Sequence, residues 1–231
     1  MKPEGFIREW LLNMILAIDT ATQFAALALY DQDGLLAEES WYADRNHTIE
    51  LMPHIVRMLK TAQLQVTDLS ALAVALGPGS FTGLRVGLAV AKGLALPYKL
   101  PVIGVPTLEI AAYPFRDQPL PVWAVAQAGR SRILAACYGQ QEERWQLLIE
   151  PYLTSFEALG QALETPVICT GEIDHQAAKT LQQHSNSRAR IVSPAARLRR
   201  SGYLAEIAAR RLASNEQDDP DALVPIYVSS L

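Results

Sequence analysis

The segment Gly77–Leu96, GPGSFTGLRVGLAVAKGLAL, constrains the fold of this chain more than any other stretch. It begins as a glycine turn directly after the apolar run 71–76 and continues with few polar side chains. Gly77 and Gly79 permit backbone angles that are closed to other residues, and Ser80 is of a type that caps helices. The segment therefore predicts a buried strand, a turn and a helix over 81–96 that ends before Pro97.

The composition of this helix needs an explanation. Small residues recur every four positions and form one row along the helix: Gly83, Gly87, Ala91 and Ala95. A glycine inside a helix costs about 1 kcal/mol relative to alanine, so the row implies a compensating close contact. The contact is either with the core of an α/β domain or with a partner helix. Two features argue against a membrane span: Arg85 and Lys92 interrupt the run, and it is shorter than the ~20 residues required.

Length and composition indicate a globular chain. Its 231 residues fit one large domain or two small ones, and 50% hydrophobic with 19% charged residues argues against disorder. A net charge of −4 provides no general attraction to nucleic acid. Charged residues interrupt any early apolar stretch, so no secretory signal is recognised and a cytoplasmic protein is expected. Cys137 and Cys169 lack metal-type spacing and are expected to be buried, reduced thiols.

The order of expected elements is the same in both halves of the chain. Strands expected at 14–18, 24–30 and 35–42 precede a helix at 48–64, a strand at 71–76, the helix at 81–96 and a strand at 102–105. Strands at 122–127, 133–138 and 145–149 open the second half in the same way. We therefore predict an N-terminal extension over 1–13, with Met14 as an alternative start, a first lobe over 14–113 and a second over 114–231.

One candidate site lies at the ends of two predicted strands. Asp19 and Thr20 follow the first strand, and Gly77, Gly79 and Ser80 form the turn before the central helix. Backbone N–H groups at a helix start can hold phosphate, but the same residues equally cap turns. The turn matches neither a Walker A loop nor a dinucleotide fingerprint. The four histidines lack metal-ligand spacing and no Ser-His-Asp set occurs, so we predict neither a catalytic residue nor a metal site.

A second candidate is a basic stretch that contains no acidic residue between 175 and 205. It could contact a phosphate backbone, although such a run is more often a solvated surface. The residues considered for an RNA contact are Arg188, Arg190, Arg199 and Arg200.

Several of these segments together resemble the bacterial TsaB (YeaZ) family. The segments are 15–22, 47–48, 77–85, 93–95 and 101–105, and the resemblance is close over about 14–113 and looser beyond. It implies an α/β fold with two RNase H-like lobes of the actin/Hsp70/sugar-kinase (ASKHA) type, each with a mixed sheet flanked by helices. It also implies a non-catalytic partner of the TsaD subunit in threonylcarbamoyladenosine (t6A) modification of tRNA, beside the anticodon in tRNAs that read codons beginning with A.

The resemblance further implies partners and an interface. The partners would be the TsaD paralogue, the ATPase TsaE, tRNA through the complex, and a second copy when the chain is alone, with no membrane. ATP, ADP and metal would be bound by the partner subunits, and the loop around Asp19 and Ser80 would be a vestigial phosphate site. The helices 48–64 and 81–96 would form the interface, for which we expect Leu51, His54, Ile55, Met58, Gly83, Gly87, Val90, Ala91 and Leu94.

The sequence also departs from the pattern of these relatives. The catalytic paralogues carry H-H-x-E-G-H where this chain reads Pro106–Ala111, so that only Glu109 matches. The second lobe reads Ala124–Gln127 where a strand usually ends in Asp, and the usual P-x-Y-x-R tail reads Pro225–Ser229. These departures favour a chain without catalysis of its own. The alternative is a nucleotide-dependent transferase or phosphotransferase of the same superfamily, which would use the loop around Asp19.

Overall fold

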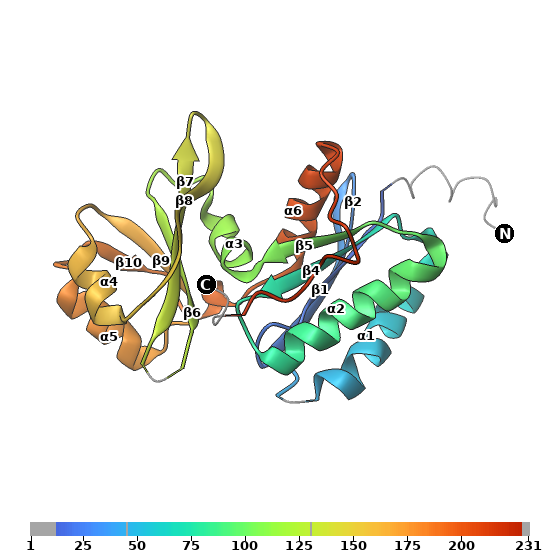
Figure 1. The fold of residues 1–231 in the computed structure, drawn as a ribbon, viewed down its shortest axis with the longest axis horizontal. Coiled ribbons are helices and arrows are strands. Elements are labelled where there is room, and N and C mark those ends of the chain that lie inside the picture. The colour runs from blue at the N-terminus through green and yellow to red at the C-terminus, as the bar shows by residue number, and fades with distance from the viewer. Residues whose placement is uncertain (1–12, 45, 130, 228–231) are drawn as a thin grey trace. The chain divides into compact units, whose positions relative to one another are not determined.

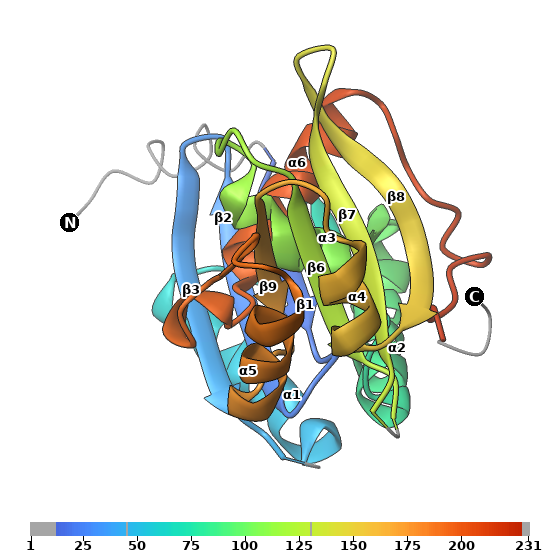
Figure 2. The same cartoon turned by 90° about the vertical axis from the view of Figure 1, so that its left-hand side faces the viewer.

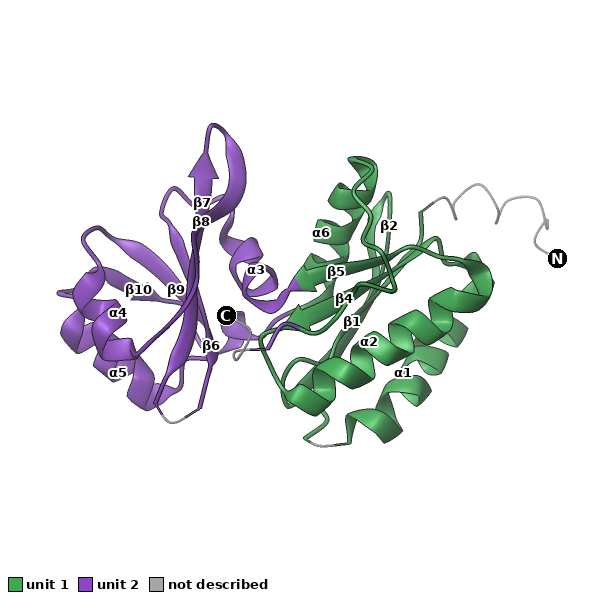
Figure 3. Ribbon diagram, in the orientation of Figure 1, with its two compact units in different colours: residues 1–105, 200–225 green, residues 106–199, 226–231 purple. Residues whose placement is uncertain are grey.

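A computed structural model describes residues 13–44, 46–129 and 131–227. The chain divides into two compact units (Figure 3). Unit 1 comprises residues 1–105 and 200–225, and unit 2 comprises residues 106–199 and 226–231. The predicted extension 1–13 lies outside the described residues except for Asn13, whose N–H donates to Ser70 Oγ at 3.2 Å.

Unit 1 is built on a five-stranded mixed sheet in the order β3-β2-β1-β4-β5 (Figure 1). Strand β1 pairs antiparallel with β2 and parallel with β4, and β2 pairs antiparallel with β3. Its elements in chain order are β1 (Ile15–Asp19), β2 (Phe24–Asp31), β3 (Gly34–Tyr42), α1 (His47–Thr61), η2 (Val66–Asp68), β4 (Ala71–Gly77), α2 (Phe81–Ala95), η3 (Leu96–Tyr98), β5 (Val102–Pro106) and, much later, α6 (Ser201–Ala213).

The central strands β1 and β4 are apolar along their whole length because both faces of the sheet are covered. Every residue of each strand is buried. Helices α1 and α2 pack together on one side, and α6 packs against β1 to β4 from the other side (Figure 1). The continuous apolar runs at 14–18 and 71–76 follow from this arrangement.

Unit 2 repeats the same sheet order, β10-β9-β6-β7-β8. Its elements are α3 (Thr107–Ala112), η4 (Tyr113–Phe115), β6 (Val122–Gln127), β7 (Ile133–Gln141), β8 (Arg144–Thr154), α4 (Phe156–Ala162), β9 (Val167–Gly171), α5 (His175–His184), β10 (Ala189–Ile191) and η5 (Ala195–Arg197). Helices α4 and α5 lie side by side over one face of this sheet (Figure 2). Leu159, Leu181 and Val125 belong to the core beneath them, and Leu108 and Ala112 of α3 belong to a second core.

The division of the chain differs from the predicted boundary at 113/114. Unit 2 begins at residue 106, and residues 200–225 return to unit 1. The reason is packing: Leu204, Ala205 and Ala208 of α6 are fully buried, and the helix packs against β1 and β2 of unit 1. The prolines at 114–121 lie within unit 2, between α3 and β6. In the part of the chain that is described, no helix is long and apolar enough to cross a membrane.

Candidate functional site

The loops that follow β1 and β4 lie against each other at the start of α2. Asp19 is buried, and its Oδ1 accepts a hydrogen bond from the N–H of Ala21 at 2.9 Å. The N–H of Ser80 donates to the carbonyl of Ala21 at 2.7 Å. Ser80 Oγ caps α2 by accepting from the N–H of Gly83 at 3.2 Å, as its residue type predicted. The structure thus brings together Asp19, Thr20, Gly77, Gly79 and Ser80, but polar groups of Asp19, Thr20 and Ser80 are bound by the backbone of Ala21 and Gly83.

The glycines of this region allow the start of α2 to lie directly on the β1 loop. A Cβ on Gly79 would lie 2.2 Å from the carbonyl oxygen of Ala21, and one on Gly83 would lie 2.1 Å from the carbonyl oxygen of Thr20. A Cβ on Gly87 would lie 2.3 Å from Thr20 Oγ1, which donates to the carbonyl of Gly83 at 2.7 Å. The row of small residues is therefore used inside unit 1, where α2 packs on β1.

This packing corrects most of the predicted interface residues. Six of them are buried within unit 1: Gly83, Gly87 and Ala91 on α2, and Leu51, Ile55 and Met58 on α1. Apolar periodicity indicates the face that a helix buries, and here that face covers the sheet of the same unit. His54, Val90 and Leu94 are half-buried.

The outward surface of the two helices is formed by other residues. Ile49 is 74% exposed, Val56 57% and Met52 39% on α1, and Phe81 is 53% exposed on α2. Ala89 and Gly93 of α2 are also exposed, and a Cβ on Gly93 would meet no atom within 4 Å. We call these six residues the outward face. Met52 and Val56 lie four residues apart on α1, and this spacing places them on one side of the helix.

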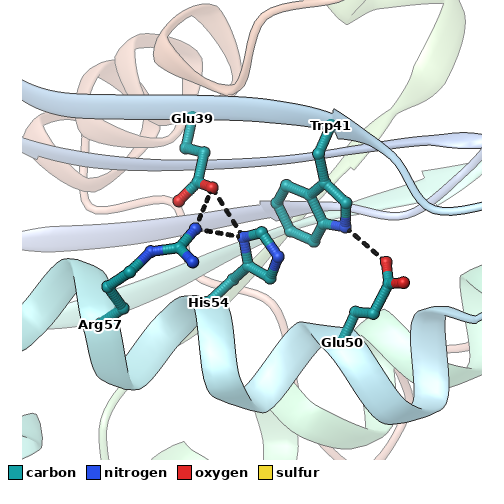
Figure 4. Close-up of polar contacts among 5 residues, drawn as sticks. All are labelled: Glu39, Trp41, Glu50, His54 and Arg57. Carbon is teal, nitrogen blue, oxygen red and sulfur yellow. Dashed lines mark hydrogen bonds and ion pairs between the residues drawn. The ribbon is translucent and has the colours of Figure 1, made fainter.

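A polar cluster holds α1 against the edge strand β3 (Figure 4). His54 Nδ1 lies 2.7 Å from Glu39 Oε1, and Arg57 contacts the same carboxylate oxygen. The imidazole of His54 stacks on the indole of Trp41, with ring centroids 3.8 Å apart. The indole N–H in turn donates to Glu50 Oε2 at 2.9 Å (Figure 4). This cluster was not predicted from the sequence, since Glu39 and Trp41 lie on another element, separated from α1 by a loop.

Three of the four arginines predicted to contact RNA have partners within their own units. The Nη1 of Arg188 donates to the carbonyl of Leu163 at 3.1 Å, and Arg199 lies 3.9 Å from Glu172. Arg200 Nε donates to Glu38 at 2.7 Å, in unit 1. Arg190 of β10 is exposed. Arg188, Arg190 and Arg199 belong to unit 2 and Arg200 to unit 1, and their contact with RNA stays a prediction.

Neither of two open cavities of the described residues is lined by a predicted site residue. One, of about 510 Å³, lies in unit 1 at the start of β1 and is lined by Ile15, Tyr30 and residues of α6 such as Arg210. The other, of about 320 Å³, lies in unit 2 beside the capping residues Ser155 and Asp174 of α4 and α5. At the end of β6, where the strand of the related family usually ends in Asp, this chain has Gln127, and the N–H of Gln127 donates to Glu172 at 2.8 Å.

Two units with the same strand order, each a mixed five-stranded sheet flanked by helices, define a protein of the actin-like two-lobe class. A solved structure supports this class: YeaZ from Pseudomonas aeruginosa superposes with a TM-score of 0.77 at 24% identity, over 94% of this chain and 100% of that chain.

Sequence comparisons identify the family within that class. The family model of TsaD, tRNA N6-adenosine threonylcarbamoyltransferase, matches residues 39–227. The "tRNA threonylcarbamoyladenosine biosynthesis protein TsaB" of Escherichia coli K12 is 36% identical over 162 residues, which is 70% of this chain and 64% of that protein. The TsaB protein of Bacillus subtilis 168 is 40% identical over 98 residues, 42% of this chain and 43% of that protein.

The chain therefore belongs to the family of TsaD and TsaB proteins. Within that family, the relatives and the solved structure compared above are TsaB (YeaZ) proteins. The matched part spans less than two thirds of the length of these curated TsaB relatives.

Proposed function

We propose that this chain acts in t6A modification of tRNA as a non-catalytic partner of a TsaD-type subunit. The names of its TsaB relatives support the pathway. The single observation that carries the partner role is the outward face of α1 and α2, where Ile49 and Val56 are more than half exposed. Neighbouring exposed apolar side chains on packed helices are typical of protein interfaces.

The finer parts of the proposal concern partners and location. The chain pairs with TsaD through the outward face, associates with the ATPase TsaE in the complex, reaches tRNA only through that complex and works in the cytoplasm. Alone, it forms a homodimer through the same face. Nucleotide and metal are bound by the partner subunits, and the loop around Asp19 and Ser80 is a structural remnant of a phosphate site.

The test is the mass of the chain mixed with TsaD from the same organism, measured by light scattering after size exclusion. We expect a mixed species at the sum of the two chains. Val56→Asp places a carboxylate in the outward face and abolishes that species, whereas Leu148→Asp, an equal change at a residue of β8 that is 38% exposed, leaves it intact. The buried Gly87 is unsuitable for this test, because its substitution disturbs the fold.

The alternative enzyme predicts a different result. If no mixed species forms and the isolated chain binds ATP in a manner lost in Asp19→Ala, the scaffold proposal is wrong. The nucleotide-dependent transferase then replaces it. The observation that favours this alternative is the convergence of Asp19, Thr20 and Ser80 at the ends of β1 and β4.

A further inference from the structure

Charge on the two outward helices is opposite in sign to that of the chain. Apart from histidines, α1 and α2 carry four cationic residues, Arg57, Lys60, Arg85 and Lys92, and one carboxylate, Glu50. The chain as a whole has a net charge of −4. The side with the exposed apolar residues is therefore a cationic region of an acidic protein.

The positions of these charges decide which of them a partner meets. Lys60 and Arg85 are exposed, and the side chain of Arg57 is 58% exposed although it is paired with the carboxylate of Glu39. Lys92 is half-buried and donates to the carbonyl of Leu223 at 2.9 Å. Glu50 is half-buried and accepts from Trp41. The charges that surround the outward face are thus mainly positive.

The apolar content of this surface indicates that its partner is a protein. Ile49 is 74% exposed, and the Arg85 guanidinium lies 3.9 Å above the ring of Phe81, which is itself half exposed. Aromatic and arginine side chains of this kind are enriched in protein interfaces. A nucleic-acid backbone would gain little from burying Ile49 and Val56.

A second copy of this chain meets these charges unfavourably. In a two-fold pair the same surface lies on both sides of the interface, so exposed cations approach exposed cations. Like charges across an interface oppose association, and opposite charges favour it. Salt screens both the repulsion between like charges and the attraction between opposite charges, with a Debye length of about 10 Å at 0.1 M.

From this charge distribution, and resting on the proposed function, we propose that the outward face selects a protein partner whose facing helices carry carboxylates. The cations that attract that partner weaken the pairing of two copies of this chain. The two associations therefore respond to salt in opposite directions. The pair with the partner weakens as salt rises, and the homodimer strengthens.

The experiment measures both dissociation constants at 50 and 500 mM NaCl, by analytical ultracentrifugation of the full chain alone and with TsaD from the same organism. We expect the mixed pair to weaken about tenfold and the self-pair to tighten over this range. The double variant Lys60→Glu/Arg85→Glu weakens the mixed pair about tenfold at low salt, and it binds the unchanged chain more tightly than that chain binds itself. The variant Lys179→Glu/Arg144→Glu, an equal change at exposed residues of unit 2, leaves both constants unchanged.

The outcomes separate this inference from the function on which it rests. If the mixed pair forms with the same constant at both salt concentrations and in the double variant, the charge selection is refuted and the proposed function stands. If no mixed pair forms at either salt concentration, both fail. If the double variant loses binding to tRNA while it keeps TsaD, the face binds nucleic acid and the inference is overturned.

Discussion

The position of Gly87 leads to a sharp prediction about the packing of α2 on β1. In Gly87→Ala the new Cβ would lie 2.3 Å from Thr20 Oγ1 and 3.7 Å from Ile18 Cγ2, so only the hydroxyl obstructs it. Rotating that hydroxyl away breaks its hydrogen bond to the carbonyl of Gly83, at a cost of about 1–3 kcal/mol for a buried group. The helix itself gains about 1 kcal/mol from alanine. We expect a net destabilisation of up to about 2 kcal/mol, measured by urea unfolding followed by circular dichroism.

Two further variants isolate the cause. Gly93→Ala makes the same chemical change on the same helix, but its Cβ points into open space, so it stabilises by about 1 kcal/mol. In a Thr20→Ala background the obstructing oxygen is absent, and Gly87→Ala then also stabilises by about the same amount. The reasoning is refuted if Gly87→Ala has the same sign with and without the Thr20 hydroxyl, or if Gly87→Ala and Gly93→Ala are equally stable.

Three other predictions concern two buried thiols, one helix cap and one ion pair. Burial raises the pKa of Cys137 to about 11 and of Cys169 to about 12, so both thiols stay protonated at pH 8 and should react with Ellman's reagent only in denaturant; rapid reaction of the folded chain would contradict this. Asp174 Oδ1 caps α5 by accepting from the N–H of Ala177 at 2.7 Å. Asp174→Ala removes this cap and should lower the free energy of unfolding in urea by about 1 kcal/mol, whereas Asp174→Asn should keep most of that stability. Arg211→Met removes a donor to the carbonyl of Gly104 and the partner of Asp218, and should lower the free energy of unfolding by about 1–3 kcal/mol; an unchanged denaturation midpoint would refute the role of this pair.

Much of the fold could be predicted from local patterns. The three opening strands were recognised in both halves, and the helices and strands that follow them in the first half, because turns and apolar runs are local properties of the sequence. The return of α6 to unit 1 could not be predicted, since nothing in Ser201–Ala213 specifies which of two similar sheets it covers. The structure places it against β1 and β2.

The candidate site was harder to predict for a related reason. The sequence predicted α1 and α2 as helices, but it could not distinguish the side of each helix that covers the sheet from the side that faces outward. Gly87 belongs to the first side because a partner far away in the sequence, Thr20, occupies the space that a side chain would need. Val56 belongs to the second side, although it is as apolar as its buried neighbour Ile55.

The late return of α6 has a consequence for folding during synthesis. When residues 1–105 have left the ribosome, the helix that covers the second face of their sheet has not yet been made, so β1 and β2 keep an uncovered apolar side. Unit 2 is almost continuous in sequence and can assemble as it emerges. The sheet of the first half is thus covered last, after about 100 further residues have been added, and until then it exposes the kind of apolar surface that promotes aggregation.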